Sequence, residues 1–286
     1  MRRLVYVGLA ALVASAAFGA VSEDTAGIPG SAPGPITSND AMGSIIQSWT
    51  TPAGVNGRGC LETGGYVIVN TYYNPQYVCT TAGSLIRSHN ISLGSGWRDS
   101  SRCHLGTGYY AILKANSPYT VAFMNHSTGS VAGSFNTSSM GSWPMNLAYD
   151  PDASCYYANS YSMRTSAYKY STVGSLTGTI VIGGMGTYVG ALGYTKAAKG
   201  ESGAYIWASN FGATTEAICT TTGSVIASWS GAETNGCGGD CGKSSVNGAW
   251  VVWELRSPTL RLYEYDIEGL VTIAPESLGA IKTLFK

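Results

Sequence analysis

Short runs of aromatic and β-branched residues alternate with turns rich in glycine and serine along most of the chain. Alternate positions of each run are large and apolar, which is the period of a β-strand with one buried face. No segment sustains the 3.6-residue apolar period of an amphipathic helix. The pattern therefore predicts an all-β protein built from many short strands.

One of these turns and the strand after it recur along the chain. The unit is Gly-Ser, a β-branched or leucine residue, a variable stretch and an aromatic or apolar residue six positions after the glycine. A degenerate copy starts at Gly269, followed by the tail 277–286. The five regular copies are 43–49, 83–89, 129–135, 174–180 and 223–229.

Two further strands recur in phase with that unit. A glycine or serine precedes an aromatic-rich run at 65–69, 108–112, 154–158, 203–207 and 248–253. Another run precedes each Gly-Ser turn, at 77–80, 119–123, 167–170, 217–220 and 261–265. The runs 144–149 and 189–194 are rich in small residues and are expected to be innermost strands.

The copies start 40, 46, 45, 49 and 46 residues apart. That period is typical of a four-stranded propeller blade. A β-sandwich would not explain the repeat and a β-helix would need a shorter one, so we predict a β-propeller with five full repeats and room for a degenerate sixth. The ring closes if the strand 44–49 joins the last blade.

These units resemble the repeats of secreted bacterial propeller proteins of uncharacterised function, in the style of NHL and YVTN repeats. The resemblance covers most of residues 43–286, including the tail 277–286. It implies a propeller fold and export from the cell. It transfers no catalytic residue, because its motifs specify blades and a fold alone does not assign function.

The N-terminus has the layout of a secretory signal peptide. Arg2 and Arg3 precede an apolar run, 4–12, which ends in small residues. We expect residues 1–20 to be the signal peptide, 21–42 a flexible leader and 43–286 the propeller domain. The mature protein should then be secreted or attached to the cell surface, without a segment that inserts into the membrane.

The chain has 16 basic and 16 acidic residues, so its formal net charge is zero. Phosphate-backbone binding needs clustered Lys and Arg, so nucleic acid is not an expected partner. The Gly-Ser repeats are not phosphate loops, since no Gly-Lys-Ser/Thr follows them, and no Gly-x-Ser-x-Gly nucleophile elbow occurs, so we expect no cofactor.

All seven cysteines lie beyond the signal-like segment, where disulfides can persist. Cys237 and Cys241 are the expected pair, because the glycines between them could fold back as a turn. The same two could supply half a metal site, but no second pair or neighbouring histidine completes it. Asp150 and Asp152 could offer oxygens to Ca²⁺ but lack the remaining ligands, so no metal site is predicted.

Few ionisable residues fall between the repeated strands, and they yield two catalytic hypotheses. A glycosidase would use carboxylates that face the channel, for which Glu62, Asp99 and Asp240 are the candidates. A lyase would pair a base with a cation, as the segment from Arg98 to His104 allows. Turn support and a solvated loop are the competing explanations of these residues.

The aromatic residues are more suggestive, with 19 Tyr and 7 Trp in the chain. Trp97 and Trp143 break the alternation of the repeated strands and are expected to project toward a ligand, with Arg98 and Arg102 beside them. The preferred hypothesis is a secreted, non-catalytic module that binds an extracellular glycan or protein, or has a structural role. The alternative is a polysaccharide hydrolase or lyase acting at the central channel.

Overall fold

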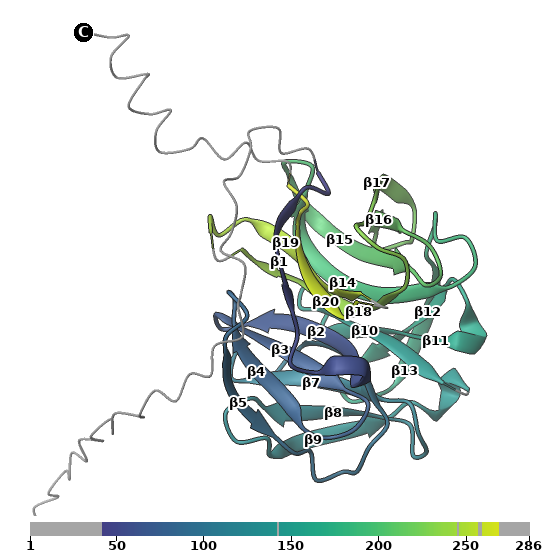
Figure 1. The fold of residues 1–286 in the computed structure, drawn as a ribbon. Coiled ribbons are helices and arrows are strands. Elements are labelled where there is room, and N and C mark those ends of the chain that lie inside the picture. The colour runs from purple at the N-terminus through teal and green to yellow at the C-terminus, as the bar shows by residue number, and fades with distance from the viewer. Residues whose placement is uncertain (1–41, 142, 245, 257–258, 269–286) are drawn as a thin grey trace, which may run out of the picture.

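The computed structural model describes residues 42–268 except 142, 245, 257 and 258. This part of the chain forms five antiparallel sheets of four strands, arranged in a ring (Figure 1). The prediction of a β-propeller is confirmed. No helix of the described residues is long and apolar enough to span a bilayer.

Each blade runs from an inner strand at the ring's centre to an outer strand at its edge. Blade 1 consists of β2 (Gly57–Thr63), β3 (Tyr66–Thr71), β4 (Gln76–Thr80) and β5 (Leu85–His89). Blade 2 consists of β6 (Trp97–Arg102), β7 (Tyr109–Lys114), β8 (Thr120–Asn125) and β9 (Val131–Asn136). Blade 3 consists of β10 (Pro144–Asp150), β11 (Cys155–Ser160), β12 (Ser166–Ser171) and β13 (Leu176–Val181). Blade 4 consists of β14 (Val189–Ala198), β15 (Glu201–Asn210), β16 (Thr215–Thr220) and β17 (Val225–Ser230). Blade 5 consists of β18 (Gly236–Lys243), β19 (Trp250–Arg256), β20 (Arg261–Asp266) and β1 (Ile45–Thr50).

The ring closes through its first strand. β1 pairs antiparallel with β20, which makes an N-terminal strand the outer edge of the last blade, as predicted. Five blades therefore complete the circle, and the ring has no gap for a sixth blade. The degenerate repeat after Gly269 lies outside the described residues. Connections in the described part of the chain include three single-turn 3₁₀ helices, η1 (Gly54–Asn56), η2 (Ser138–Met140) and η3 (Tyr161–Met163).

The glycine of the repeated Gly-Ser turn packs against an aromatic side chain of the preceding blade. Gly83 has φ +90°, and a Cβ there would lie 2.6 Å from the Trp49 ring of the preceding blade's outer strand. Ring or Cβ atoms of His89, Phe135 and Trp229 would likewise crowd a Cβ on Gly129, Gly174 and Gly43, each at less than 3.0 Å. The first residue of each of these repeats must therefore be glycine for two reasons, its positive φ and the aromatic ring that covers it.

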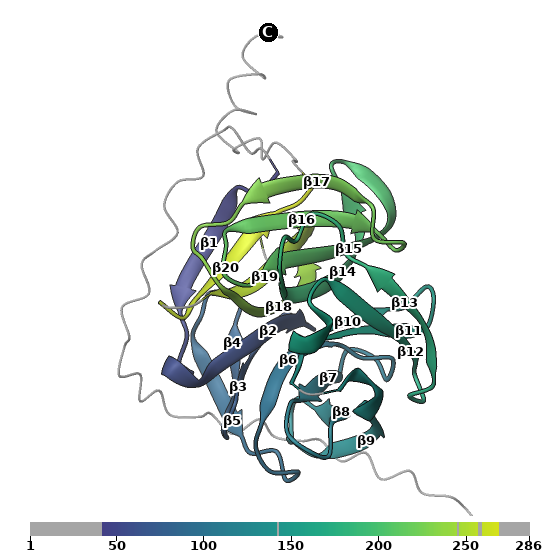
Figure 2. The same cartoon turned by 90° about the vertical axis from the view of Figure 1, so that its right-hand side faces the viewer.

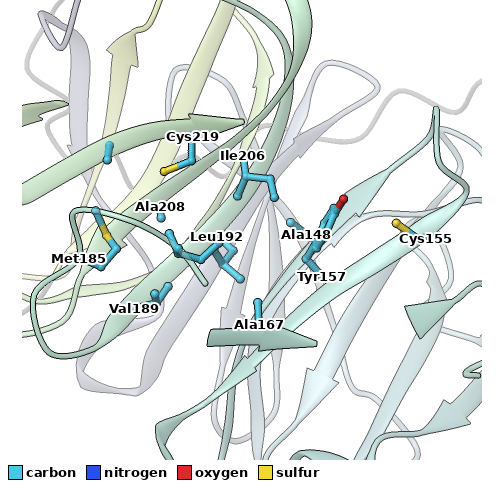
Figure 3. Close-up of a cluster of buried hydrophobic side chains, with 12 residues drawn as sticks. Ala148, Cys155, Tyr157, Ala167, Met185, Val189, Leu192, Ile206, Ala208 and Cys219 are labelled. Atoms are coloured by element: carbon cyan, nitrogen blue, oxygen red, sulfur yellow. The ribbon is translucent and has the colours of Figure 1, made fainter. Parts of the chain in front are cut away.

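Apolar side chains fill the spaces between neighbouring blades. Figure 3 shows one such cluster, in which Ala148 and Tyr157 of blade 3 lie opposite Leu192 and Ile206 of blade 4. Figure 2 shows the inner strands converging near the middle of the molecule and the outer strands at its periphery. The inner strands line the central channel, and this is where the charged residues of interest are placed.

Candidate functional site

The channel has two different ends. All five inner strands run in the same direction, because each is the first or equivalent strand of its blade. We call the end at which they begin the arginine end, for Arg58 and Arg98, and the end at which they finish the opposite end. The loops that follow the second strand of each blade also reach the arginine end, because that strand pairs antiparallel with the inner one.

Asp99 fills the channel interior rather than facing an open cavity. It is fully buried, and its carboxylate accepts hydrogen bonds from the amides of Ser100 at 2.9 Å and Leu147 at 3.4 Å. The Gly239 amide donates to it as well. Burial raises the pKa of Asp99 well above its usual range, against the opposing effect of these hydrogen bonds. Its carboxyl thus joins β6, β10 and β18 across the ring.

Asp240 joins a second set of inner strands in the same way. Its carboxylate accepts hydrogen bonds from the amides of Cys241 at 2.8 Å, Arg102 at 2.9 Å and Tyr194 at 3.3 Å. The hydroxyl of Ser101 donates at 3.0 Å. Burial raises the pKa of Asp240 too, although Arg102 and the hydrogen bonds oppose the shift. These contacts connect β18, β6 and β14.

The third carboxylate candidate also serves the backbone. Glu62 is buried, and its two oxygens accept hydrogen bonds from the amides of Gly65 at 2.9 Å and Lys243 at 3.1 Å. The structure therefore brings Asp99 and Asp240 into one electrostatic neighbourhood, while Glu62 lies toward the opposite end. All three carboxylates are occupied by main-chain donors, and none lies at an exposed surface.

His104 lies apart from these carboxylates. Its Nδ1 is 3.0 Å from the hydroxyl of Tyr156 and its ring packs edge-on against Phe123 with 4.6 Å between centroids. Burial lowers the pKa of His104 from its usual value. Among the described contacts of this ring, aromatic side chains and Cys103 predominate. The residues of the predicted lyase cluster are thus divided between the two ends and the core.

The four predicted ligand-binding residues are also separated. Trp97 is wholly buried, and its Nε1 donates to the carbonyl of Gly94 at 2.8 Å, so the prediction that it projects toward a ligand is wrong. Trp97 is the first residue of the inner strand β6 and packs between blades 1 and 2. The repeated motifs of the sequence did not reveal this strand. Arg102 lies at the opposite end, whereas Arg98 and Trp143 meet at the arginine end.

Cations and aromatic rings alternate at the arginine end. The guanidinium carbon of Arg98 lies 5.3 Å from the Tyr72 ring centre and 5.7 Å from that of Trp143. The guanidinium of Arg58 lies 5.8 Å from the same Tyr72 ring. The Tyr72 hydroxyl donates to Asn116 at 2.9 Å, which helps to hold the ring that both arginines contact. Trp143 is 53% exposed and forms the outer wall.

A register shift near the start of every inner strand aims these side chains at the arginine end. One extra residue interrupts the pairing just after the first position of each inner strand, as in a β-bulge, which re-aims a side chain. The extra residue is Arg58 in β2, Met145 in β10, Gly190 in β14 and Cys237 in β18, and falls within 98–99 in β6. Two of five equivalent positions on adjacent blades therefore present an arginine.

Exposed aromatic side chains continue around this end. They sit in the loops that leave the second strands or enter the inner ones, and Tyr161 stacks on Tyr188 with 4.5 Å between centroids and 8° between planes. The sequence analysis did not select Tyr72, Tyr161 or Tyr188. Tyr72 and Tyr161 directly follow a strand and Tyr188 directly precedes one, where the alternation of strand residues ends. The exposed members are Tyr73, Trp143, Tyr161 and Phe211.

The opposite end has its own cationic pair, but acidic groups accompany it. Arg102 and Lys243 lie over the Trp250 ring at 4.7 Å and 4.4 Å from its centre. The Trp250 amide donates to Glu268 at 2.6 Å, and Lys196 pairs with Asp152 at 2.6 Å. Its positive charges therefore stand beside negative ones.

No disulfide joins Cys237 and Cys241, which corrects the expected pairing. Both lie on β18, where four residues of extended chain span roughly 13 Å, beyond the ~7 Å limit between bridged Cα atoms. The intervening glycines do not form a turn. They belong to the channel wall, where a Cβ on Gly238 would lie 2.5 Å from Asp99. Cys241 is a buried free thiol and burial raises its pKa.

Asp150 and Asp152 serve different partners and do not converge on a cation. Asp150 Oδ1 accepts from the amides of Asp152 and Ala153, both at 2.9 Å, which supports the turn. Asp152 instead contacts Lys196 and Tyr194. Within residues 42–268 as far as they are described, no group of three or more His, Cys, Asp or Glu side chains is placed to hold a metal ion.

Comparison with known proteins gives the fold and no activity. No family model matches the chain, and no curated protein sequence matches it. Among solved structures, glutaminyl cyclase of Myxococcus xanthus superposes with a TM-score of 0.56 at 12% identity, over 79% of this chain and 96% of that one. The WD40 propeller domain of Doa1 reaches a TM-score of 0.45 at 16% identity, over 72% and 62% of the two chains. The superposition on the glutaminyl cyclase supports the propeller fold of this chain and shows the fold alone.

Proposed function

We propose that this protein is a secreted, non-catalytic module that binds an extracellular glycan through the arginine end of its propeller. The observation that carries the proposal is the set of exposed aromatic side chains in the loops at the end of the propeller that also carries Arg58 and Arg98. The signal-like segment at residues 1–20 supports export, although it lies outside the described residues.

The aromatic loops suit a sugar ring better than a flat protein surface. The apolar face of a pyranose packs on a planar aromatic ring, and the polar tips of Tyr and Trp remain available for hydrogen bonds to hydroxyl groups. Trp143 supplies one exposed ring, and Tyr161 is held by its stack on Tyr188. Held rings lose little conformational entropy when a ligand binds, which favours affinity.

The engagement of the channel carboxylates supports a binding role over hydrolysis. A glycosidase needs one carboxylic acid and one carboxylate on either side of an accessible bond. Asp99 and Asp240 are buried and saturated by main-chain donors, so freeing either would break contacts between inner strands. The similarity to a glutaminyl cyclase, at 12% identity, carries no enzymatic inference for this chain.

The test is to incubate the mature protein with a panel of insoluble and soluble polysaccharides, measuring both retention and newly released reducing ends. We expect retention on at least one polysaccharide without release. Trp143→Ala should abolish most retention, whereas Val246→Ala, a similarly exposed residue near the opposite end, should not. Release of sugar ends, or equal loss in the two variants, would overturn the proposal.

A further inference from the structure

The Arg98 guanidinium is held in place by rings rather than by an acid. It lies over the rings of Tyr72 and Trp143, whose centres are 5.3 Å and 5.7 Å from its carbon. A guanidinium stacked on aromatic faces keeps its N–H groups in its own plane and directs them outward from the stack. Two aromatic walls therefore hold a planar donor edge at the channel mouth.

Charge compensation for Arg98 is missing from the described part of the chain. The ion pairs among the described residues involve Asp152, Glu216 and Glu254, and none includes Arg98. Its Nε is buried without a hydrogen-bond partner among these residues. The adjacent Asp99 turns its carboxylate into the channel, toward main-chain amides.

A second guanidinium, that of Arg58, adds positive charge near Arg98. Arg58 occupies the equivalent position of the neighbouring blade and shares the Tyr72 ring with Arg98. Burial and the nearby Arg58 lower the pKa of Arg98, the direction expected when like charges approach. An oxyanion bound close to Arg98 would offset this repulsion.

We propose that Arg58 and Arg98 bind an oxyanion substituent of the glycan, a carboxylate or a sulfate ester on a sugar ring. This inference rests on the proposed function, since it names the class of glycan that the same surface takes. Guanidinium groups bind such anions through paired N–H donors, with geometry that a neutral hydroxyl cannot match. The aromatic walls would contact the faces of the sugar that carries the anion.

The cationic pair at the opposite end makes the assignment specific. Lys243 and Arg102 also share one ring, Trp250, but Glu62 and Asp240 lie directly beneath their strand ends. An incoming anion there would meet carboxylates already in place. Lys243 is exposed, so Lys243→Gln removes the same unit of charge as Arg98→Gln without touching the arginine end.

The experiment measures dissociation constants for four probes: polygalacturonate, its methyl-esterified form, dextran sulfate and dextran. The first pair isolates a carboxylate and the second a sulfate. We expect at least one anionic probe to bind more tightly than its neutral partner. Arg98→Gln should weaken that binding roughly 10- to 100-fold, the range for loss of a charge-assisted hydrogen bond. Lys243→Gln should leave it within about twofold, as expected for a charge remote from the ligand.

Further variants keep the result interpretable. Arg98→Lys retains the charge but loses the planar fork, so its affinity should fall between those of the wild type and Arg98→Gln. Arg58→Gln tests the second guanidinium independently, and unfolding temperatures show that each variant is folded. Binding that is equal for anionic and neutral probes would overturn this inference while leaving glycan binding intact. Binding to no polysaccharide would overturn both this inference and the proposed function. Equal losses of affinity in Arg98→Gln and Lys243→Gln would overturn the assignment to the arginine end, because the effect would then depend only on the net charge of the protein.

Discussion

The channel interior and the arginine end differ although they are built from adjacent residues of the same strands. Asp99 is buried and accepts hydrogen bonds from strands of other blades, while Arg98 beside it lies against two aromatic rings at the mouth. The interior carboxylates accept hydrogen bonds from the fold itself, whereas Arg98 at the mouth has no ion-pair partner among the described residues. A titratable residue in a propeller channel is therefore no evidence of catalysis until its hydrogen bonds have been counted.

The largest effect should follow from removing an interior carboxylate. Asp240→Ala leaves the amides of Cys241, Arg102 and Tyr194 and the Ser101 hydroxyl without their acceptor. Unsatisfied buried donors cost about 1–3 kcal/mol each, and water entering the gap recovers part of that, so we expect a loss of about 4 kcal/mol. Urea denaturation measures it. A loss below about 1 kcal/mol would mean that the interior carboxylates do not tie the blades together, because surface substitutions give changes of that size.

A smaller but still structural effect should follow from filling the narrow channel. A Cβ on Gly238 would lie 2.5 Å from both Asp99 Oδ1 and the Arg58 carbonyl, so Gly238→Ala should cost about 2 kcal/mol through overpacking. Gly106 is the matched control, since it also has positive φ but a Cβ added there would meet no atom within 4 Å. Equal destabilisation of Gly238→Ala and Gly106→Ala would show that backbone strain, and not channel width, decides the residue.

Truncating a side chain at the arginine end should weaken ligand binding and leave the free energy of unfolding nearly unchanged. Tyr161→Ala removes an exposed ring that stacks on Tyr188 and should weaken glycan binding about 3- to 10-fold, the worth of one aromatic contact. Its free energy of unfolding should stay within about 0.5 kcal/mol of the wild type, as for other exposed positions. A stability loss comparable to that of the interior variants would remove the distinction between the two regions.

The smallest effect should be on the pH dependence of stability, through His89 at the contact between two blades. Burial lowers the pKa of His89, which packs on the next blade's Gly129. The unfolded chain then binds the proton more readily, so this residue's contribution to stability is present above pH ~6.5 and is lost as the pH falls toward the folded pKa. His89→Phe, which mimics Phe135 in the equivalent position, should show a weaker fall in unfolding temperature between about pH 7.5 and 5.5, a range that brackets the ordinary histidine pKa. An unchanged pH profile would contradict the assignment.

The sequence predicts the blades well because the signal is local. Each Gly-Ser repeat has glycine at its turn and an aromatic or apolar residue six positions on, and both contacts are made within one repeat and its neighbour. The inner strands β2, β14 and β18 are less visible in the sequence, because glycines interrupt their alternation of side chains. In β18 a Cβ on Gly239 or Gly242 would press against the neighbouring strands. This is why the segment from Cys237 to Cys241 resembled a disulfide-bonded turn.

The site is harder to predict because its contacts are distant in sequence. Asp240 meets Ser101 and Arg102 from 139 and 138 residues away, so nothing local reveals that its carboxylate is satisfied. Arg98 and Trp143 were both identified as ligand-binding candidates, and the structure brings them together from different blades. The prediction for Trp97 was wrong because this tryptophan lies outside the repeated strands, which indicated a loop. It is in fact the first residue of the inner strand β6.

The central claim is that a glycan binds at the arginine end, and hydrogen exchange tests it most directly. Exchange is measured on the protein alone and with the polysaccharide on which the protein is retained most strongly. The account predicts slower exchange in peptides that contain Arg98, Tyr72 and Trp143, with no change around Lys243 and Trp250 at the opposite end. Protection confined to the opposite end, or no protection at the arginine end under saturating ligand, would contradict it.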